Sequence, residues 1–171
     1  DGFLAQGANV AFIGRSDATA FVAEMEAKHG RAPLFLQGDM KDTAHLQATM
    51  RQAAKAHGGL DVLVNNAAND DRHVLDEVTP EYWDWMQSIN LKSYYFACQE
   101  SARLMKASGG SIVNFSSTSY IMGGAGYTAY TAANGGITAM SRSLARELGP
   151  EKIRVNALAP GWVLTPKQLD K

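Results

Sequence analysis

The sequence predicts an α/β fold built on a mostly parallel sheet. Short apolar runs alternate with amphipathic stretches along the chain, which is the pattern of repeated strand and helix units. The apolar runs carry few charges, as expected of strands that are buried on both faces of a sheet. At 171 residues and 46% hydrophobic content, the chain has the size and composition of one domain with its own core.

Five strands are predicted, each bounded by Gly, Pro, Asn or Asp. In chain order they occupy residues 9–13, 33–37, 60–65, 111–117 and 153–158. Residues 1–7 are predicted to be the end of a helix that leads into the first strand. Each run is short and apolar, which suits a strand in the interior of a parallel sheet.

Helices are predicted between the strands. An apolar stripe at helical spacing ends at Gly58, which suits the left-handed position after a helix. Thr79 suits the N-cap of the next helix, and Pro80 its first position, where a missing N–H costs nothing. Two long helices are expected at residues 93–106 and 127–148.

The composition narrows the classes of function. With 16 Lys and Arg against 17 Asp and Glu, the net charge is -1 and no basic stripe is present, so we expect no nucleic-acid partner. No apolar run approaches the roughly 18 to 20 residues of a membrane span, and no signal-like segment is visible, so we expect a cytoplasmic protein without a membrane partner. Cys98 is the only cysteine, which excludes an internal disulfide and favours a buried thiol.

The strongest candidate site combines a serine with a tyrosine thirteen residues later. Ser117 ends the predicted strand 111–117, and Tyr130 lies near the start of the longest helix, four residues before Asn134. Because positions i and i+4 of a helix face the same side, Tyr130 and Asn134 are predicted to project into one space. The three polar side chains are therefore expected to form a site.

Five motifs in chain order resemble the short-chain dehydrogenase/reductase family. They are the strand and turn of residues 59–68, Asn90 in Ser88-Ile89-Asn90-Leu91, Ser117, Tyr130, and the strand and Pro-Gly turn of residues 153–165. The resemblance covers nearly the whole chain. The segment Asn69-Asp70-Asp71-Arg72-His73 is similar to the corresponding segment of sugar dehydrogenases of the D-xylose and related aldose type.

The resemblance implies a Rossmann-like doubly wound parallel sheet with helices on both faces. Residues 1–171 would be a single, partial dinucleotide-binding domain that also carries the catalytic site. The first strand and the glycine-rich turn of that fold are absent from the sequence, since no apolar strand precedes Gly2 or Gly7. We therefore expect the interior of a longer polypeptide, whose sheet lacks its central strand here. A homodimer or homotetramer is expected, paired through the two long helices.

The resemblance also implies hydride transfer between a nicotinamide cofactor and a hydroxyl or carbonyl substrate. Tyr130 would exchange a proton with the reacting oxygen, Ser117 would polarise that oxygen, and Asn90 would hold a water of the proton relay. The family has a lysine where this chain has Asn134, which would bind a ribose hydroxyl without a charge. A cation about 4 Å from a phenolate is worth about 4 kcal/mol at an effective dielectric near 20. We therefore expect turnover to be weakened, shifted to alkaline pH or absent, unless another cation replaces the lysine.

The expected cofactor is NADP rather than NAD. Gly14 stands where NAD-preferring relatives have an acid, and Arg15 suits a 2′-phosphate, although a helix-flanking arginine without this role is the alternative. The resemblance implies further cofactor contacts: Asp39 and Met40 at the adenine, Asn65, Asn66 and Ala67 at the adenosine ribose, and Pro160, Gly161, Val163 and Thr165 at the carboxamide.

A sugar or polyol is the predicted substrate. Asp70, Asp71 and His73 would then lie near a polyhydroxy compound, with a solvated charged loop as the alternative. They make a poor donor set for a metal, and no metal is expected. Two other functions stay open: a 3-oxoacyl or general ketone reductase of the same family, and a cofactor-binding protein that has lost turnover through Asn134.

Overall fold

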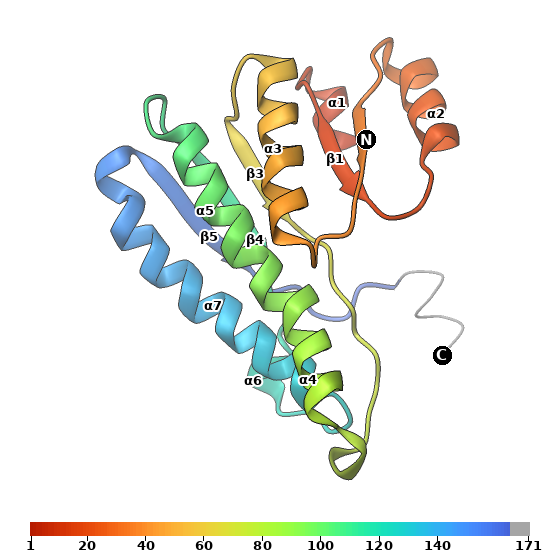
Figure 1. The fold of residues 1–171 in the computed structure, drawn as a ribbon, viewed down its shortest axis with the longest axis vertical. Helices are drawn as coiled ribbons and strands as arrows, with labels where there is room; N and C mark the ends of the chain where they lie inside the picture. The colour runs from red at the N-terminus through yellow and green to blue at the C-terminus, as the bar shows by residue number, and fades with distance from the viewer. Residues whose placement is uncertain (165–171) are drawn as a thin grey trace.

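The computed structural model describes residues 1–164, in which five strands form two parallel sheets (Figure 1). Strand β1 (Ala11–Gly14) pairs with β2 (Leu34–Gln37). Strand β4 (Gly110–Phe115) lies between β3 (Val62–Asn65) and β5 (Ile153–Leu158). All five predicted strands are present, each within two residues of its predicted ends. The two sheets are not paired with one another in the described residues, as expected of a sheet without its central strand.

The described residues contain seven α-helices, and a π-helical turn lies between the fourth and the fifth. They are α1 (Gly2–Ala5), α2 (Thr19–His29), α3 (Thr43–His57), α4 (Pro80–Gln87), α5 (Ser93–Met105), α6 (Ser119–Met122) and α7 (Thr128–Leu148). A π-helical turn, Ser88–Lys92, joins α4 to α5, and 3₁₀ turns occupy Leu75–Glu77 and Gly149–Glu151. In the described residues, no helix is both long enough and apolar enough to cross a membrane.

The helix ends follow from local chemistry. The Thr79 hydroxyl accepts a hydrogen bond from the Tyr82 N–H at 3.2 Å, which confirms the predicted cap of α4, and Pro80 takes the first position. Asp42 caps α3 by accepting from the His45 N–H. Gly58 ends α3 in the left-handed region at φ 79°, where other residues are strained.

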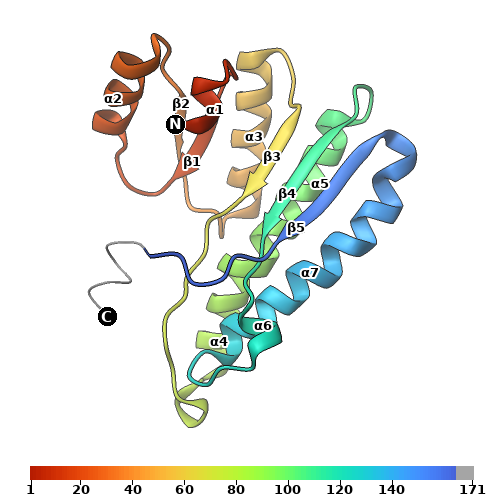
Figure 2. The ribbon, with the colours of Figure 1, turned by 180° about the vertical axis from the view of Figure 1, so that it is seen from behind.

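Helices lie on both sides of the strands. Helices α3, α5 and α7 lie in front of the strands in Figure 1 and behind them in Figure 2, whereas α1 lies on the other side. The main core packs between α5, α7 and the three-stranded sheet, and its buried residues are Cys98, Met105, Ile112, Leu148, Ile153 and Val155. A second cluster, in which Leu46 and Met50 of α3 meet Ala97 of α5, joins these two helices.

One face of the three-stranded sheet is open in the described chain (Figure 2). Val62 and Val64 of β3 are 45% and 37% exposed, while Leu63 between them packs against the core. Successive side chains of a strand point to opposite faces, so helices cover the side chains on only one face of β3. The expectation that the strands are buried on both faces is therefore wrong for β3, because no described helix covers β3 on that side.

Candidate active site

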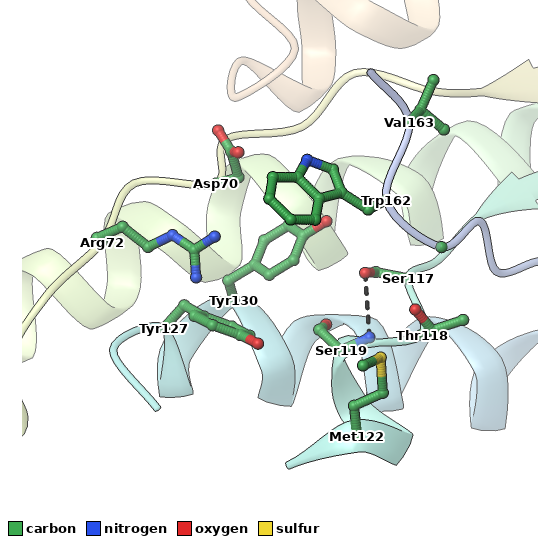
Figure 3. Close-up of a pocket in the computed structure, with 11 residues that line it drawn as sticks. Asp70, Arg72, Ser117, Thr118, Ser119, Met122, Tyr127, Tyr130, Trp162 and Val163 are labelled. Atoms are coloured by element: carbon green, nitrogen blue, oxygen red, sulfur yellow. Dashed lines mark hydrogen bonds between the residues drawn. The ribbon is translucent and has the colours of Figure 1, made fainter. Parts of the chain in front are cut away.

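A cavity of about 440 Å³ lies beyond the carboxyl ends of β4 and β5, beside the first turn of α7 (Figure 3). Parallel sheets place their ligand sites at this end of the strands. Four segments that are distant in sequence supply the lining. They contribute Asp70 and Arg72; Ser117, Thr118, Ser119 and Met122; Tyr127 and Tyr130; and Gly161, Trp162 and Val163.

The structure brings Ser117 and Tyr130 to the same cavity. Alternation after β4 turns Ser116 toward α7, where its hydroxyl donates to the Asn134 carbonyl at 2.9 Å, and leaves Ser117 on the cavity side. The Ser117 Oγ accepts a hydrogen bond from the Ser119 N–H at 3.2 Å, which leaves its own proton for another acceptor. Tyr130 stands on the first turn of α7, with its ring edge-on to Tyr127.

Asn134 lies one turn beyond Tyr130 but is not among the lining residues. It is 3% exposed, and its Nδ2 donates to the backbone carbonyl of Tyr130 at 2.9 Å. The shared helix face therefore exists, but the carboxamide is bound to the helix backbone. A contact between Asn134 and a ribose hydroxyl stays a prediction.

Asn90 holds the loop that begins the cavity wall. It lies in the π-helical turn, is 1% exposed, and its Oδ1 accepts from the Asn69 N–H at 2.8 Å. Its Nδ2 donates to the carbonyls of Asn69 at 3.1 Å and of Met86 at 3.0 Å. The Asn90 carboxamide thus binds both the N–H and the carbonyl of Asn69, the residue directly before Asp70. The predicted water in the proton relay remains a prediction.

His73 anchors the other end of this loop. Its Nε2 accepts from the Ala129 N–H at 3.2 Å, which satisfies a backbone donor in the first turn of α7. Its Nδ1 lies 3.2 Å from the Tyr82 hydroxyl, and the backbone N–H of His73 donates to the Gly126 carbonyl at 2.9 Å. His73 does not line the cavity. Its ring therefore connects the loop to α4 and α7.

Arg72 is a site residue that the sequence did not reveal as one. Its guanidinium carbon lies 4.2 Å from the centroid of the Tyr127 ring, on the cavity wall (Figure 3). In the sequence the two residues are far apart, so the pair arises only when the loop docks on α7. Lys92, a cation two residues after Asn90 in the sequence, lines a groove between α5 and α7 instead of the cavity. Among the described lining residues, Arg72 is the one cation.

A second tyrosine near the site has a phenol whose pKa is raised. Tyr94 of α5 is 1% exposed, and burial raises the pKa of its phenol, with the charge of Tyr130 as a further cause. Tyr94 is therefore a neutral group behind Tyr130. The described residues contain no group of three or more His, Cys, Asp and Glu side chains that would hold a metal ion.

The residues predicted to bind the adenosine end of the cofactor differ in their surroundings. Arg15 is exposed after β1, and its carbonyl accepts from the Gln37 side chain at 2.9 Å. The Asp39 carboxylate accepts from the Lys41 N–H at 2.9 Å. Met40 packs beside the second core cluster. These three residues do not line the cavity.

Asn65 belongs to the core. It is 2% exposed, and its Nδ2 donates to the Asn114 Oδ1 at 2.8 Å, so its side chain ties β3 to β4. Asn66 and Ala67, which follow it, are exposed at the carboxyl end of β3, where the backbone is open to a ligand.

The segment after β5 reaches the cavity. Gly161 and Val163 line it, and the Pro160 carbonyl accepts from the Thr118 N–H at 3.1 Å. Thr165 lies outside the described residues. Exposed backbone after β3 and a cavity after β4 and β5 together fit the ribose and nicotinamide end of a dinucleotide. The chain's glycines do not form the turn that would hold its pyrophosphate.

Known proteins resemble the chain over nearly all of its length. The family model described as enoyl-(acyl carrier protein) reductase matches residues 1–170. The probable galactose dehydrogenase GalD of Rhizobium meliloti (strain 1021) is 42% identical over 171 residues, which is 98% of this chain and 67% of that protein. D-xylose 1-dehydrogenase of Caulobacter vibrioides is 40% identical over 169 residues, which is 98% of this chain and 66% of that protein. The chain thus spans about two thirds of the length of these relatives.

Solved structures show the same arrangement. A structure assigned to the short-chain alcohol dehydrogenases, from Sinorhizobium meliloti 1021, matches with a TM-score of 0.88 and 37% identity over 95% of this chain and 65% of that one. The Cj0485 dehydrogenase matches with a TM-score of 0.91 and 27% identity over 97% of this chain and 64% of that one. With a family match over residues 1–170 and relatives of this identity, the chain belongs to the short-chain dehydrogenase/reductase family.

Proposed function

We propose that the protein containing this chain oxidises a sugar or polyol with a nicotinamide cofactor. Residues 1–171 would be one dinucleotide-binding domain that also carries the catalytic site. The observation that carries the proposal is the meeting of Ser117 and Tyr130 in one cavity beyond the carboxyl ends of the strands. The names of the relatives, galactose and D-xylose dehydrogenases, support the substrate class.

Tyr130 and Ser117 would have different roles at the substrate hydroxyl. When bound, the nicotinamide supplies a hydride acceptor for the carbinol carbon. The Tyr130 phenol, as phenolate, takes the hydroxyl proton, so that no alkoxide has to form in free solution. The Ser117 Oγ–H, which is not used by the hydrogen bond that Oγ accepts from the Ser119 N–H, would donate to the same oxygen. In the reverse direction Tyr130 returns the proton to the carbonyl oxygen.

NADP is the cofactor we favour. Support comes from Gly14 and the exposed Arg15 after β1, where an acid would otherwise accept the ribose hydroxyls. The test compares kcat/KM for NADP and NAD in the wild type and in Arg15→Gln. If Arg15 binds the 2′-phosphate, the variant loses NADP efficiency and keeps NAD efficiency. An equal effect on both cofactors would contradict this role.

A homodimer or homotetramer formed through α5 and α7 is part of the proposal. These helices border a groove of about 700 Å³ that carries Tyr95, Phe96 and Met140, and Tyr95 is 47% exposed. Sedimentation of wild type and Tyr95→Glu tests it, because a charge buried in the interface would shift the protein toward monomers. A cytoplasmic location is also part of the proposal.

The enzyme test uses the full-length protein. D-galactose, D-xylose and other aldoses are incubated with NADP or NAD from neutral to alkaline pH, and the reduced cofactor is followed by its absorbance. Ser117→Ala is the control, since it keeps the fold and removes the polarising hydroxyl. Cofactor binding without turnover of any substrate would favour the impaired cofactor-binding protein.

A ketone reductase is the second candidate. The description of the family model as an enoyl-(acyl carrier protein) reductase favours it, as do 3-oxoacyl-[acyl-carrier-protein] reductase relatives, for example that of Chlamydia pneumoniae at 34% identity. Reduction of an acetoacetyl thioester with a kcat/KM above that for every sugar would support this candidate over sugar oxidation.

A further inference from the structure

Arg72 presents hydrogen-bond donors to the cavity that contains Ser117 and Tyr130. Figure 3 shows its side chain reaching over Tyr127 toward Tyr130. The guanidinium carbon lies 4.2 Å from the Tyr127 ring centroid, which is a cation–π distance. A guanidinium carries five N–H donors, so this one contact leaves donors for another partner.

The backbone on both sides of Arg72 is held in place. On one side Asn90 binds both backbone groups of Asn69, whose own Oδ1 accepts from the Asp71 N–H at 2.9 Å. On the other side His73 binds the Ala129 N–H and the Gly126 carbonyl. A ligand that meets Arg72 therefore has little backbone ordering to impose, which favours binding.

The cavity wall combines groups that suit a hydroxylated ring. Asp70 supplies a carboxylate that accepts from hydroxyl groups, and Arg72 supplies donors to their oxygens. Tyr127, Tyr130 and Trp162 supply aromatic surface for C–H groups. An apolar acyl chain would offer no acceptor to the Arg72 guanidinium, which disfavours it.

We propose that Arg72 is a specificity-determining residue, which donates a hydrogen bond to a hydroxyl oxygen of the substrate away from the reacting carbon. This rests on the proposed sugar or polyol oxidation. The substrate it selects is neutral, because the Asp70 carboxylate lines the same cavity and disfavours an anion. Arg72 thus separates polyhydroxy substrates from simple alcohols that Ser117 and Tyr130 alone would accept.

The test compares Arg72→Met and Arg72→Lys with the wild-type full-length protein. Arg142→Met is the matched control, since Arg142 is exposed on α7 outside the cavity lining. The substrates are the aldose that the wild type oxidises best, cyclohexanol, which has no second hydroxyl, and D-3-hydroxybutyrate, which is anionic. Thermal unfolding shows whether each variant is folded.

Arg72→Met should lower kcat/KM for the aldose by about ten- to a hundredfold, the loss expected for a charged hydrogen bond. The loss should appear mainly in KM, cyclohexanol should be little affected, and Arg72→Lys should retain part of the efficiency. An aldose KM that stays at the wild-type value would overturn the assignment, as would an equal loss for cyclohexanol or a greater loss for D-3-hydroxybutyrate. A wild type that oxidises no sugar overturns the proposed function itself, and this assignment with it.

Discussion

The Asn134 carboxamide donates a hydrogen bond to the backbone carbonyl of Tyr130, 2.9 Å away and one turn earlier on α7. Asn134 is 3% exposed, and its backbone carbonyl accepts from the Ser116 hydroxyl. The side-chain amide group and the backbone carbonyl of Asn134 are therefore both used within the fold. A positive charge for the cavity has to come from another residue, and Arg72 is the cation among the described lining residues.

Asn134→Lys should raise turnover at neutral pH and move the rising limb of the kcat profile for oxidation from alkaline pH toward neutrality. A lysine here adds a cation that favours the phenolate over the phenol, whereas asparagine adds none. The measurement is kcat as a function of pH with saturating cofactor and substrate. Asn134→Met is the control, because it has similar length and no charge. Equal profiles for the Lys and Met variants would contradict the electrostatic reason.

Tyr130→Phe should lower kcat by about two to four orders of magnitude, because proton exchange with the reacting oxygen is lost. The matched control is Tyr127→Phe, which keeps the ring under Arg72 and removes only a hydroxyl on the same helix. Steady-state kinetics and cofactor binding are measured for both variants. If Tyr127→Phe loses as much kcat as Tyr130→Phe, Tyr130 is not the proton donor.

His73→Leu should lower the free energy of unfolding by about 1 kcal/mol, as for the loss of other helix caps, because the Ala129 N–H loses its acceptor. It should also raise the substrate KM, since the loop that carries Arg72 loses its anchor. His73→Gln keeps an acceptor at about the same reach and should recover part of both quantities. Urea unfolding measures the free energy of unfolding, and steady-state kinetics measure the substrate KM. Identical Leu and Gln variants would show that the acceptor has no role.

Removing both arginines around Glu100 should cost more stability than removing the acid. Glu100 of α5 is 2% exposed, and its carboxylate lies 3.0 Å from Arg51 of α3 and 3.0 Å from Arg103, one turn further along α5. Arg51→Gln with Arg103→Gln leaves a buried charge unpaired, at about 3 kcal/mol or more. Glu100→Gln leaves two arginine side chains that are 53% and 58% exposed and stay hydrated. Urea unfolding measures the free energy of unfolding of both variants, and an equal loss of stability in the two would contradict the prediction.

The protein should lose stability above about pH 9, partly through Cys98. Burial raises the pKa of this thiol to about 11 from 9.0, so the folded state holds a proton that the unfolded state releases. The contribution is complete below pH 9 and is lost as the pH rises through 11, at most about 3 kcal/mol for two pKa units. Burial raises the pKa of Tyr94 as well, which acts in the same direction.

Cys98→Ser provides the comparison, because a serine keeps a donor toward Asn114 and does not titrate in this range. The free energy of unfolding is measured from pH 7 to 11 for both proteins. The variant should show a shallower loss above pH 9, with the remainder due to Tyr94. Parallel curves would show that Cys98 contributes nothing to the alkaline loss.

Local sequence patterns were sufficient for most of the secondary structure. The strand at residues 153–158 has its predicted ends, and the Thr79 cap and the Gly58 end lie where their side-chain chemistry and backbone freedom place them. The open face of β3 was not predictable, because an apolar run reads the same whether one face or both are covered. Two adjacent asparagines illustrate the same limit: Asn65 lies in the core, whereas Asn66 is exposed.

By itself, the sequence determined the α/β fold and the order of its elements, because these follow from periodicity along the chain. The pairing of Ser117 with Tyr130 followed from the resemblance to the family motif. Only the tertiary structure decided that Arg72 and not His73 lines the cavity, and that the Asn134 side chain is used by its own helix. The physical reason is that these outcomes depend on contacts between residues far apart in sequence, such as His73 with Ala129 and Arg72 with Tyr127, which form only when the loop docks against α7.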